Sequence, residues 1–469
     1  PDHRGVLMRE NDKHFYKNLF VLVLPIAFQN LMSALVSASD AMMLGMVNQD
    51  SLSAVSLAAQ VQFVLSLFWA ALTIGTTILA AQYWGKNDRL SVEKILAIVL
   101  KYSFVISFLF FAAAALCPRA LMRIFTNDVT LIALGAVYLR IVSWSYLMAG
   151  ISQIYLCIMR NSGRTFKSTV YGSVSMVLNI LLNGILIFGL FGFPKLGISG
   201  AAIATVIARA AELGLAMWEN CKKDVVRIHW SLLKESHAVL RKDFVKYTSP
   251  VMANELVWGC GFTMFTVIMG HLGSDAVAAN SIAGIVKNLI SCLCIGIGSG
   301  SGIIVGNELG SGNLVRAREY GGRLCRLSLV MGAVSGVILL AFSPWIMRYA
   351  ANLSPQAQAY LHGMLFMCAY YLIAKSANMT VVAGIFCAGG DTKFGFLCDT
   401  VTMWMIIVPI GLLAAFVFKL PVLAVYFLLN LDEFVKLPAV YRHYKKYQWV
   451  RNLTREELAE EAALSGRTE

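Results

Sequence analysis

Charged residues are scarce in this sequence, and their scarcity excludes most soluble protein classes. Only 14% of the 469 residues are Asp, Glu, Lys or Arg, whereas 58% are hydrophobic and the mean hydropathy is +0.68. A soluble domain carries about 25% charged residues. The charges that are present lie between long apolar runs and form no single patch, so the net charge of +13 does not indicate nucleic-acid binding. We therefore expect an integral membrane protein.

The sequence also lacks the motifs of ATP-driven and metal-dependent enzymes. It has no Gly-Lys-Ser/Thr phosphate-binding loop, so ATP hydrolysis within this chain is not expected. The glycines of residues 296–302 follow no predicted strand, and close helix packing explains them better than a nucleotide loop does. The ten cysteines and the single histidines show no metal-ligand spacing, and most of the cysteines are expected to be small core residues. We expect no enzymatic activity and no cofactor.

The sequence contains many long runs without charged residues. Residues 18–39, 61–81 and 168–194 contain no Asp, Glu, Lys or Arg. Each run reaches the roughly 20 residues that a helix needs to cross ~30 Å of hydrocarbon. The whole pattern predicts an all-α integral membrane protein with twelve transmembrane helices. The first run is too long for a signal-peptide core and lacks a cleavage-like ending, so we expect it to remain in the protein.

The distribution of Lys and Arg predicts how the chain is oriented in the membrane. These residues are frequent in the N-terminus, the even-numbered connections and the C-terminus, and they are rare in the odd-numbered connections. By the positive-inside rule, both termini are expected in the cytoplasm and the turn at residues 46–50 outside. The basic connector at residues 219–243 either lies on the inner leaflet as an amphipathic segment or is a solvated loop.

The chain repeats itself at a nearly constant offset of 225 to 227 residues. The matching pairs are Pro25 and Pro250, Gly45 and Gly270, Asp50 and Asp275, Ala54 and Ala279, Ser56 and Ser281, Gly75 and Gly300, Gly85 and Gly310, Gly163 and Gly390, Thr165 and Thr392, and Pro194 and Pro421. Six helices per repeat is an even number, so the two repeats enter the membrane in the same direction and place a substrate cleft between them. We predict an N-lobe at 1–218, a cytoplasmic connector at 219–243, a C-lobe at 244–453 and a polar cytoplasmic tail at 454–469.

Two acidic residues inside predicted spans are candidates for ion coupling. Asp40 lies late in helix 1, and Glu255 lies early in helix 7. An ionisable side chain within a span costs roughly 2.5–3.5 kcal/mol on insertion scales, so each acid is a functional candidate, with a helix-end or salt-bridge role as the alternative. In the repeat register Asp40 matches Phe265 and Glu255 matches Asn30. We therefore expect different tasks for the two halves.

Asn179 and Asn183 place two amide groups on one face of helix 5. Their oxygens could join a carboxylate in holding Na⁺ or accept a hydrogen bond from a protonated acid, and hydrogen bonding between helices is the alternative. We expect Asn179 to orient the Asp40 carboxylate.

Other charged residues within the spans suggest pairing. Lys375 in helix 10 is expected to pair with Glu255, because an unpaired charge in a helix bundle is costly. Lys287 is a second potential partner or a snorkelling side chain. The remaining charges lie nearer the span ends, and we interpret Glu433 and Lys436 as an ordinary i, i+3 pair. These remaining charges are Arg209, Asp399, Asp432 and Glu433.

An ordered series of motifs resembles the multidrug and toxic compound extrusion (MATE) family. The motifs are Leu24-Pro25 followed by residues 39–45, Gly75 followed by residues 81–88, and residues 197–205, 305–310 and 388–392. The likeness covers roughly residues 15–453. It implies a two-lobed, V-shaped transporter of the multidrug/oligosaccharidyl-lipid/polysaccharide exporter superfamily. Such a transporter exports organic, often cationic, amphipathic compounds in exchange for Na⁺ or H⁺.

The resemblance also implies roles for individual residues. Asp40 matches the acid of an N-lobe cation site, with Tyr138, Asn179, Asn183 and Thr205 around it, and Na⁺ could bind at Asp40, Asn179 and Asn183.

In the C-lobe, Glu255 resembles the helix 7 acid, and Tyr371 and Lys375 are further candidates. Members with a C-lobe Na⁺ site carry an Asp in helix 10, and Lys375 stands near that position. This sequence has no acid at residues 371–376, so Asp40 is the better coupling candidate.

The sequence therefore predicts a cation-coupled antiporter in the plasma or inner membrane that works by alternating access as a monomer. Its expected partners are small organic substrates and the lipid bilayer. A flippase for lipid-linked saccharides is the first alternative, although it would need a basic, lipid-sized cavity, and the embedded charges here are few and balanced. A channel or a membrane scaffold is the second alternative, and the repeat and the buried acids argue against it.

Overall fold

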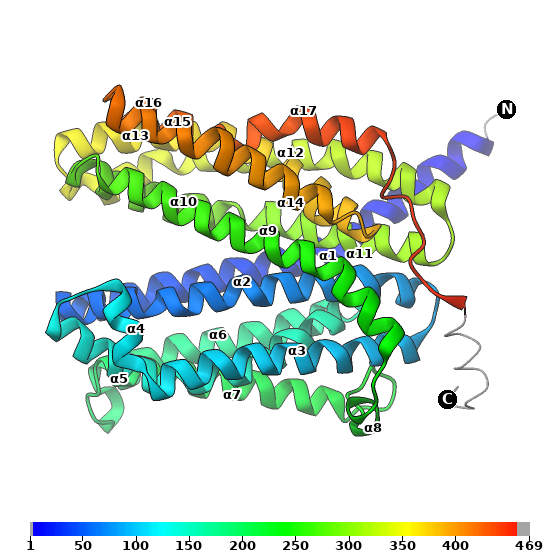
Figure 1. The fold of residues 1–469 in the computed structure, drawn as a ribbon, viewed down its shortest axis with the longest axis horizontal. Coiled ribbons are helices and arrows are strands. Elements are labelled where there is room, and N and C mark those ends of the chain that lie inside the picture. Colours follow the sequence, from blue (N-terminus) through cyan, green and yellow to red (C-terminus); the bar gives the residue numbers. More distant parts are fainter. Residues whose placement is uncertain (1–2, 457–469) are drawn as a thin grey trace. The chain divides into compact units, whose positions relative to one another are not determined.

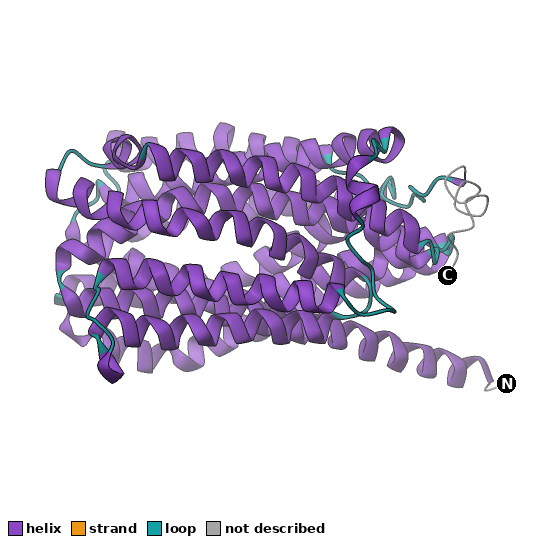
Figure 2. Ribbon diagram, turned by 90° about the horizontal axis from the view of Figure 1, so that it is seen from below, coloured by secondary structure: helices purple, strands orange, loops and turns teal. Residues whose placement is uncertain are grey.

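The computed structural model describes residues 3–456 of the chain. The described chain is built from helices joined by short loops (Figures 1 and 2) and contains eleven helices that are long and apolar enough to cross a membrane. The helices that make up these spans are α1 (His3–Val47), α2 (Gln49–Gly85), α3 (Arg89–Leu116), α5 (Val129–Asn161), α6 (Thr165–Phe188), α7 (Ile198–Asn220), α9 (Ala238–Gly270), α10 (Ser274–Ile290) with α11 (Cys292–Gly310), α12 (Leu314–Tyr349), α13 (Pro355–Asn378), and α14 (Lys393–Asp399) with α15 (Val408–Leu412). Short helices α4 (Pro118–Phe125) and α8 (Trp230–Lys234) lie in connections.

The twelfth span is divided into two short helices, α16 (Val422–Leu429) and α17 (Asp432–Lys445). Neither helix alone has the roughly 20 apolar residues needed to cross the bilayer. Asn430 and Leu431 separate them, and α17 begins with two acidic residues. Length and hydropathy therefore identify eleven spans in the described chain. The predicted twelfth helix is present as two shorter helices, α16 and α17.

The helix boundaries confirm the predicted six-helix repeat. The spans Gln49–Gly85 and Ser274–Gly310 are both 37 residues long and are separated by the offset of 225 found in the sequence. The next helix of each half begins at the same offset, at Arg89 and Leu314. The second copy is less regular, because Ser291 interrupts the counterpart of α2 and π-helical turns follow α13 and α14. Such turns occur mostly where a helix accommodates an inserted residue, often at functional sites.

The chain forms two compact units. Among the described residues, the C-unit consists of residues 3–30, 81–87 and 246–455, and the N-unit consists of residues 31–80 and 88–245. Helix α1 therefore contributes its first part to the C-unit and its later part to the N-unit. The predicted lobes, at 1–218 and 244–453, differ from these units in the segments 1–30 and 81–87. Most of the predicted polar tail lies outside the described residues.

The N-unit packs large aromatic side chains against small residues on neighbouring helices. Trp69, Tyr138 and Tyr146 lie in an apolar core with Leu65 and Leu139. The indole of Trp69 donates a hydrogen bond to Ser107 at 3.1 Å, and Ser103 donates one to the carbonyl of Gly150 at 2.7 Å. Small residues let helices approach closely where lipid supplies no hydrophobic driving force between them.

Three of the sequence motifs meet inside the C-unit. The side chain of Gln82 is fully buried; its amide nitrogen donates to the carbonyl of Ala388 at 2.7 Å, and its oxygen accepts from the backbone of Leu453 at 2.6 Å. A Cβ on Gly85 would collide with the backbone of residue 307, and a Cβ on Gly310 would collide with the backbone of Gln82. The paired glycines therefore permit backbone contact between the ends of α2 and α11.

Candidate functional site

The N-unit brings together three of the residues predicted for cation coupling. Asp40 lies in the later part of α1 and is half-buried. The amide nitrogen of Asn183, a fully buried side chain on α6, donates a hydrogen bond to Oδ1 of Asp40. Tyr138 on α5 is buried within electrostatic range of the same carboxylate. The resulting group is one acid whose polar neighbours are neutral side chains.

Asn179 and Thr205 are buried in the same unit but make no hydrogen bond to Asp40 among the described residues. The hydroxyl of Thr205 donates to the carbonyl of Ala201 at 3.1 Å. Asn179 lies one turn before Asn183 on α6, and the expectation that Asn179 orients the Asp40 carboxylate is not met: Asn183 makes that contact. The reason is position along the helix, since Asn183 lies about 6 Å further along the axis of α6 than Asn179.

Two amide oxygens on α6, one of them on the Asn183 side chain that contacts Asp40, have no partner in the described chain. Oδ1 of Asn179 and Oδ1 of Asn183 are buried and have no hydrogen-bond partner among the described residues. Carboxylate and amide oxygens are the ligands that hard cations such as Na⁺ prefer, and a buried acceptor without a partner is unfavourable. No group of three or more His, Cys, Asp or Glu side chains that could hold a metal ion occurs within the described chain. The donor set therefore suits a single monovalent cation or a proton.

The C-unit separates the residues that the sequence grouped around Glu255. Glu255 lies on α9, where Asp399 at the end of α14 and Cys387 are within electrostatic range. Within the part of the chain whose side chains are described, Glu255 and Lys375 form no ion pair. The predicted partnership between them is therefore not found.

Lys375 instead belongs to a second polar cluster in the C-unit. Its charged neighbours are Lys287 on α10 and the acids Asp432 and Glu433 on α17. Lys287 lies 4.7 Å from the ring centre of Tyr371 and 3.4 Å from Oδ1 of Asn430. Tyr371 and Lys375 are thus placed with α10 and α17, not with the Glu255 carboxylate. These contacts with Asn430 and Tyr371 account for the position of the Lys287 side chain, so it does not need to reach the membrane surface by snorkelling.

Lys436 links the two clusters through contacts that the sequence interpretation missed. Its Nζ lies 2.7 Å from Asp399 Oδ1 and 3.4 Å from Glu433 Oε2. The amide of Asn378 also donates to Glu433 Oε2 at 2.7 Å. The i, i+3 pair of Glu433 and Lys436 is present as predicted, but these residues are only 6% and 7% exposed. Because α17 begins inside the unit after the break at residues 430–431, the charged side chains of its first turns, including Glu433 and Lys436, are buried.

A buried acid on α7 was also overlooked. Glu212 is fully buried; it accepts a hydrogen bond from Ser152 at 2.7 Å and pairs with Arg209 at 3.3 Å. It lies within a predicted span, so the rule that identified Asp40 would have found it. Because Arg209 already neutralises it, Glu212 is less suited to bind a cation than Asp40 is.

Comparison with known proteins gives a consistent picture across the chain. The sequence model of the MatE family matches residues 25–185 and 250–428. YisQ of Bacillus subtilis, named an uncharacterized transporter, is 24% identical over 449 residues, which cover 95% of this chain and 97% of YisQ. NorM of Thermotoga maritima, named a probable multidrug resistance protein, is 25% identical over 348 residues, which cover 74% of each chain.

A solved structure has the same fold. The crystal structure of a mutant of the Vibrio cholerae MATE transporter VcmN matches this chain with a TM-score of 0.85 at 17% sequence identity. The match covers 94% of this chain and 99% of the VcmN chain. The all-helical architecture predicted from the sequence is therefore confirmed.

Proposed function

Because the chain belongs to the MatE family of multi-pass membrane transporters, we propose that it is an antiporter that exports organic, often cationic, amphipathic compounds in exchange for entering H⁺ or Na⁺. Alternating access moves the substrate, and the cation binds at the N-unit acid. Support for the substrate class comes from relatives such as NorM, which is named a probable multidrug resistance protein. The coupling role is inferred from residues of this chain.

The observation that supports ion coupling is the environment of Asp40. Asn183 donates to its carboxylate, and no Lys or Arg forms an ion pair with it in the described chain. The amide oxygens of Asn183 and of Asn179, one turn earlier on α6, are buried and lack partners there. A carboxylate in a helix bundle without a counter-charge is costly, and an entering cation removes that cost. A cation that binds one conformation more tightly shifts the population toward it, which is the requirement for coupled exchange.

Three acids of the C-unit, Asp399, Asp432 and Glu433, are poorer candidates for the same role. Asp399 and Glu433 are already paired with Lys436, and Lys287 and Lys375 lie close to Asp432 and Glu433. An entering cation would have to compete with these lysines. We therefore assign the coupling cation to Asp40, with Asn179 and Asn183 as potential oxygen ligands and Tyr138 and Thr205 as their surroundings. Glu255 lies near Asp399 and has no set of oxygen ligands around it among the described contacts.

The proposal includes the orientation and assembly of the protein. Both termini lie in the cytoplasm, because Lys and Arg concentrate in the connections on that side. The protein acts as a monomer in the cell membrane, since the two repeats within one chain supply both lobes of an alternating-access transporter.

Efflux of ethidium from proteoliposomes, with Na⁺ and H⁺ gradients imposed separately, tests the proposed function. Accumulation of ethidium against its own gradient under at least one of the two ion gradients is the expected result. Accumulation that needs neither gradient, or none under both, would contradict the antiport mechanism. If the protein inserts into the vesicles in both orientations, the assay measures transport by those molecules whose substrate-binding side faces the dye.

A further inference from the structure

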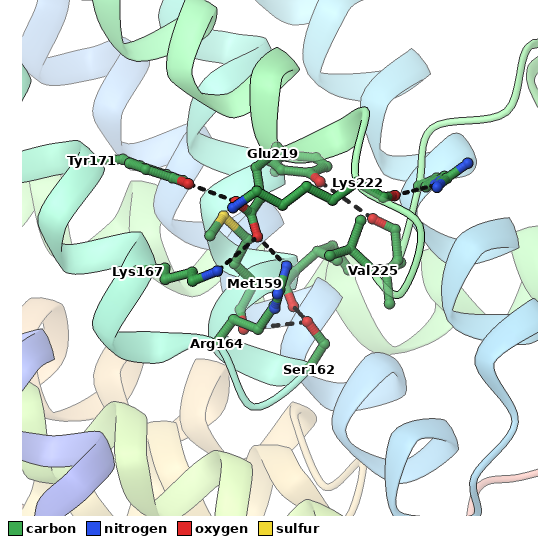
Figure 3. Close-up of polar contacts among 12 residues, drawn as sticks. Met159, Ser162, Arg164, Lys167, Tyr171, Glu219, Lys222 and Val225 are labelled. Atoms are coloured by element: carbon green, nitrogen blue, oxygen red, sulfur yellow. Dashed lines mark hydrogen bonds and ion pairs between the residues drawn. The ribbon is translucent and has the colours of Figure 1, made fainter.

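Three cationic side chains surround a single carboxylate at the end of α7 (Figure 3). Glu219 is fully buried in the last turn of this helix and forms an ion pair with Arg164. Lys222 Nζ lies 2.8 Å from Glu219 Oε2, and Lys167 Nζ lies 3.9 Å from Glu219 Oε1. The hydroxyl of Tyr171 donates to Glu219 Oε2 at 2.5 Å. All five residues belong to the N-unit.

The cluster carries more positive charge than its carboxylate can balance. One negative charge faces three positive charges, so two remain in excess. The side chains of Lys167 and Lys222 lie close enough to interact directly with each other, and they are 44% and 33% exposed. The hydrogen bond to Glu219 raises the pKa of Lys222, whereas the interaction with Lys222 lowers the pKa of Lys167. Two adjacent, partly exposed ammonium groups repel each other and together attract an anion.

An exposed apolar stripe on α6 leads directly to this pair of lysines. Val170, Val174, Val177 and Leu181 are 38%, 49%, 46% and 59% exposed, and their spacing of three and four residues places them on one face of the helix. Lys167 is seven residues before Val174 and so lies on the same face. From Lys167 to Leu181 the helix rises roughly 21 Å, somewhat more than one leaflet of a hydrocarbon core that is ~30 Å thick.

Helix α7 presents a matching stripe beside the first one. Ile207, Gly214 and Trp218 are exposed on one face, and Trp218 is 60% exposed at the end nearest Glu219. Lys222 Nζ lies 4.7 Å from the centre of the Trp218 ring. Tryptophan is enriched where the hydrocarbon core meets the head groups. Both stripes therefore pass from lipid-facing apolar residues to cationic residues at the membrane interface.

We propose that Lys167 and Lys222 bind the phosphate of an anionic phospholipid whose acyl chains lie along the exposed stripes of α6 and α7. Glu219 and Arg164 hold the two ammonium groups in place, and Trp218 contacts the region just below the head group. Basic groups between helices on the cytoplasmic side are typical binding sites for anionic lipid head groups. A free phosphate ion would use the ammonium groups but not the apolar stripes. With cytoplasmic termini, this lipid belongs to the inner leaflet.

Native mass spectrometry of the full-length protein in detergent tests the site. Titration with phosphatidylglycerol and with phosphatidylcholine of the same acyl chains gives the affinity for each lipid. Tighter binding of phosphatidylglycerol to the unmodified protein is expected. In Lys167→Gln/Lys222→Gln the affinity for phosphatidylglycerol should fall about thirty-fold, because each basic residue near an anionic lipid contributes ~1 kcal/mol. Binding of phosphatidylcholine should not change.

The matched control is Lys223→Gln/Lys234→Gln, which removes the same charge from exposed positions of the connector that carries Lys222. This control should keep nearly full affinity for phosphatidylglycerol, and Lys167→Arg/Lys222→Arg should restore it because guanidinium groups also bind phosphate. If both double Gln variants lost the same affinity for phosphatidylglycerol, the effect would be general electrostatic attraction, and the proposal would be overturned. Displacement of the lipid by inorganic phosphate at a similar concentration would instead assign the site to a soluble anion. Because the readout is lipid binding, its outcome is independent of whether the protein is an antiporter.

Discussion

The substitution Asp40→Asn separates the proposed coupling role of this acid from its structural role. In the structure, Asn183 donates a hydrogen bond to Oδ1 of Asp40. The oxygen of an asparagine at this position can still accept that bond. A hydrogen bond to a charged group contributes ~1.5–3 kcal/mol and one between neutral groups ~0.5–1.5 kcal/mol, so the contact is weakened by about 1 kcal/mol. That is a small loss, and the variant should fold and still bind substrate.

Transport against a gradient should nevertheless be lost in Asp40→Asn. A tenfold cation gradient corresponds to about 1.4 kcal/mol, which in one-for-one exchange supports about tenfold accumulation of substrate. Without a group that binds a proton or holds Na⁺, the gradient cannot drive the cycle and the accumulation ratio should fall to about one. Ethidium uptake into proteoliposomes under an imposed gradient measures the ratio, and equilibrium binding of ethidium checks that the substrate site survives.

The matched control is Glu255→Gln, which removes an acid of the C-unit with the same conservative change in shape. It should retain most of the accumulation, since no cation cage is built around Glu255. Vesicles with Asp40→Asn that still reach the accumulation ratio of the unmodified protein, while vesicles with Glu255→Gln do not, would show that the coupling role has been assigned to the wrong unit.

Three further predictions address the same architecture. Asn183→Ala should reduce coupled transport more than Asn179→Ala, because Asn183 contacts Asp40; equal transport rates in vesicles would contradict this. Lys436→Met should lower the free energy of unfolding by about 3–5 kcal/mol by leaving buried carboxylates unpaired, and Lys446→Met at an exposed position should not; thermal melting in detergent compares them. A single cysteine at residue 3, on a cysteine-free background, should resist an impermeant reagent applied outside intact cells, and labelling there would invert the topology.

The sequence was most informative where a local pattern determines the structure. Apolar runs predicted the spans, and the offset of 225 predicted the repeat, because helix length and glycine packing positions are properties of short segments. The exchange of residues 1–30 and 81–87 between units could not be predicted in this way. It depends on contacts such as that of Gln82 with Ala388 and Leu453, which are separated from it by more than 300 residues.

The candidate site was predicted in part for the same reason. Asp40 was identifiable because an acid within a span is costly wherever the chain goes. Its hydrogen-bond partner could not be identified from the sequence, because Asn179 and Asn183 share a face of α6. Which of the two amides reaches Asp40 depends on how α1 packs against α6, and in the structure it is Asn183. The Lys436 contacts were missed because the break at Asn430 and Leu431 turns a predicted span end into the buried start of α17.

The two repeats have diverged in how they balance buried negative charge, and this difference favours one of them for coupling. In the C-unit, Asp399 and Glu433 share Lys436, so their counter-charge is part of the polypeptide and is present at every stage of a transport cycle. In the N-unit, Glu212 has Arg209, whereas Asp40 has only the amide of Asn183. A permanent counter-charge makes an acid structural, because cation binding then gains little. An acid without a bonded Lys or Arg leaves a charge for a transported cation to supply, and both Asp40 and Glu255 meet that condition. Asp40 differs in that the amide of Asn183 holds its carboxylate, and this contact favours Asp40 as the coupling residue.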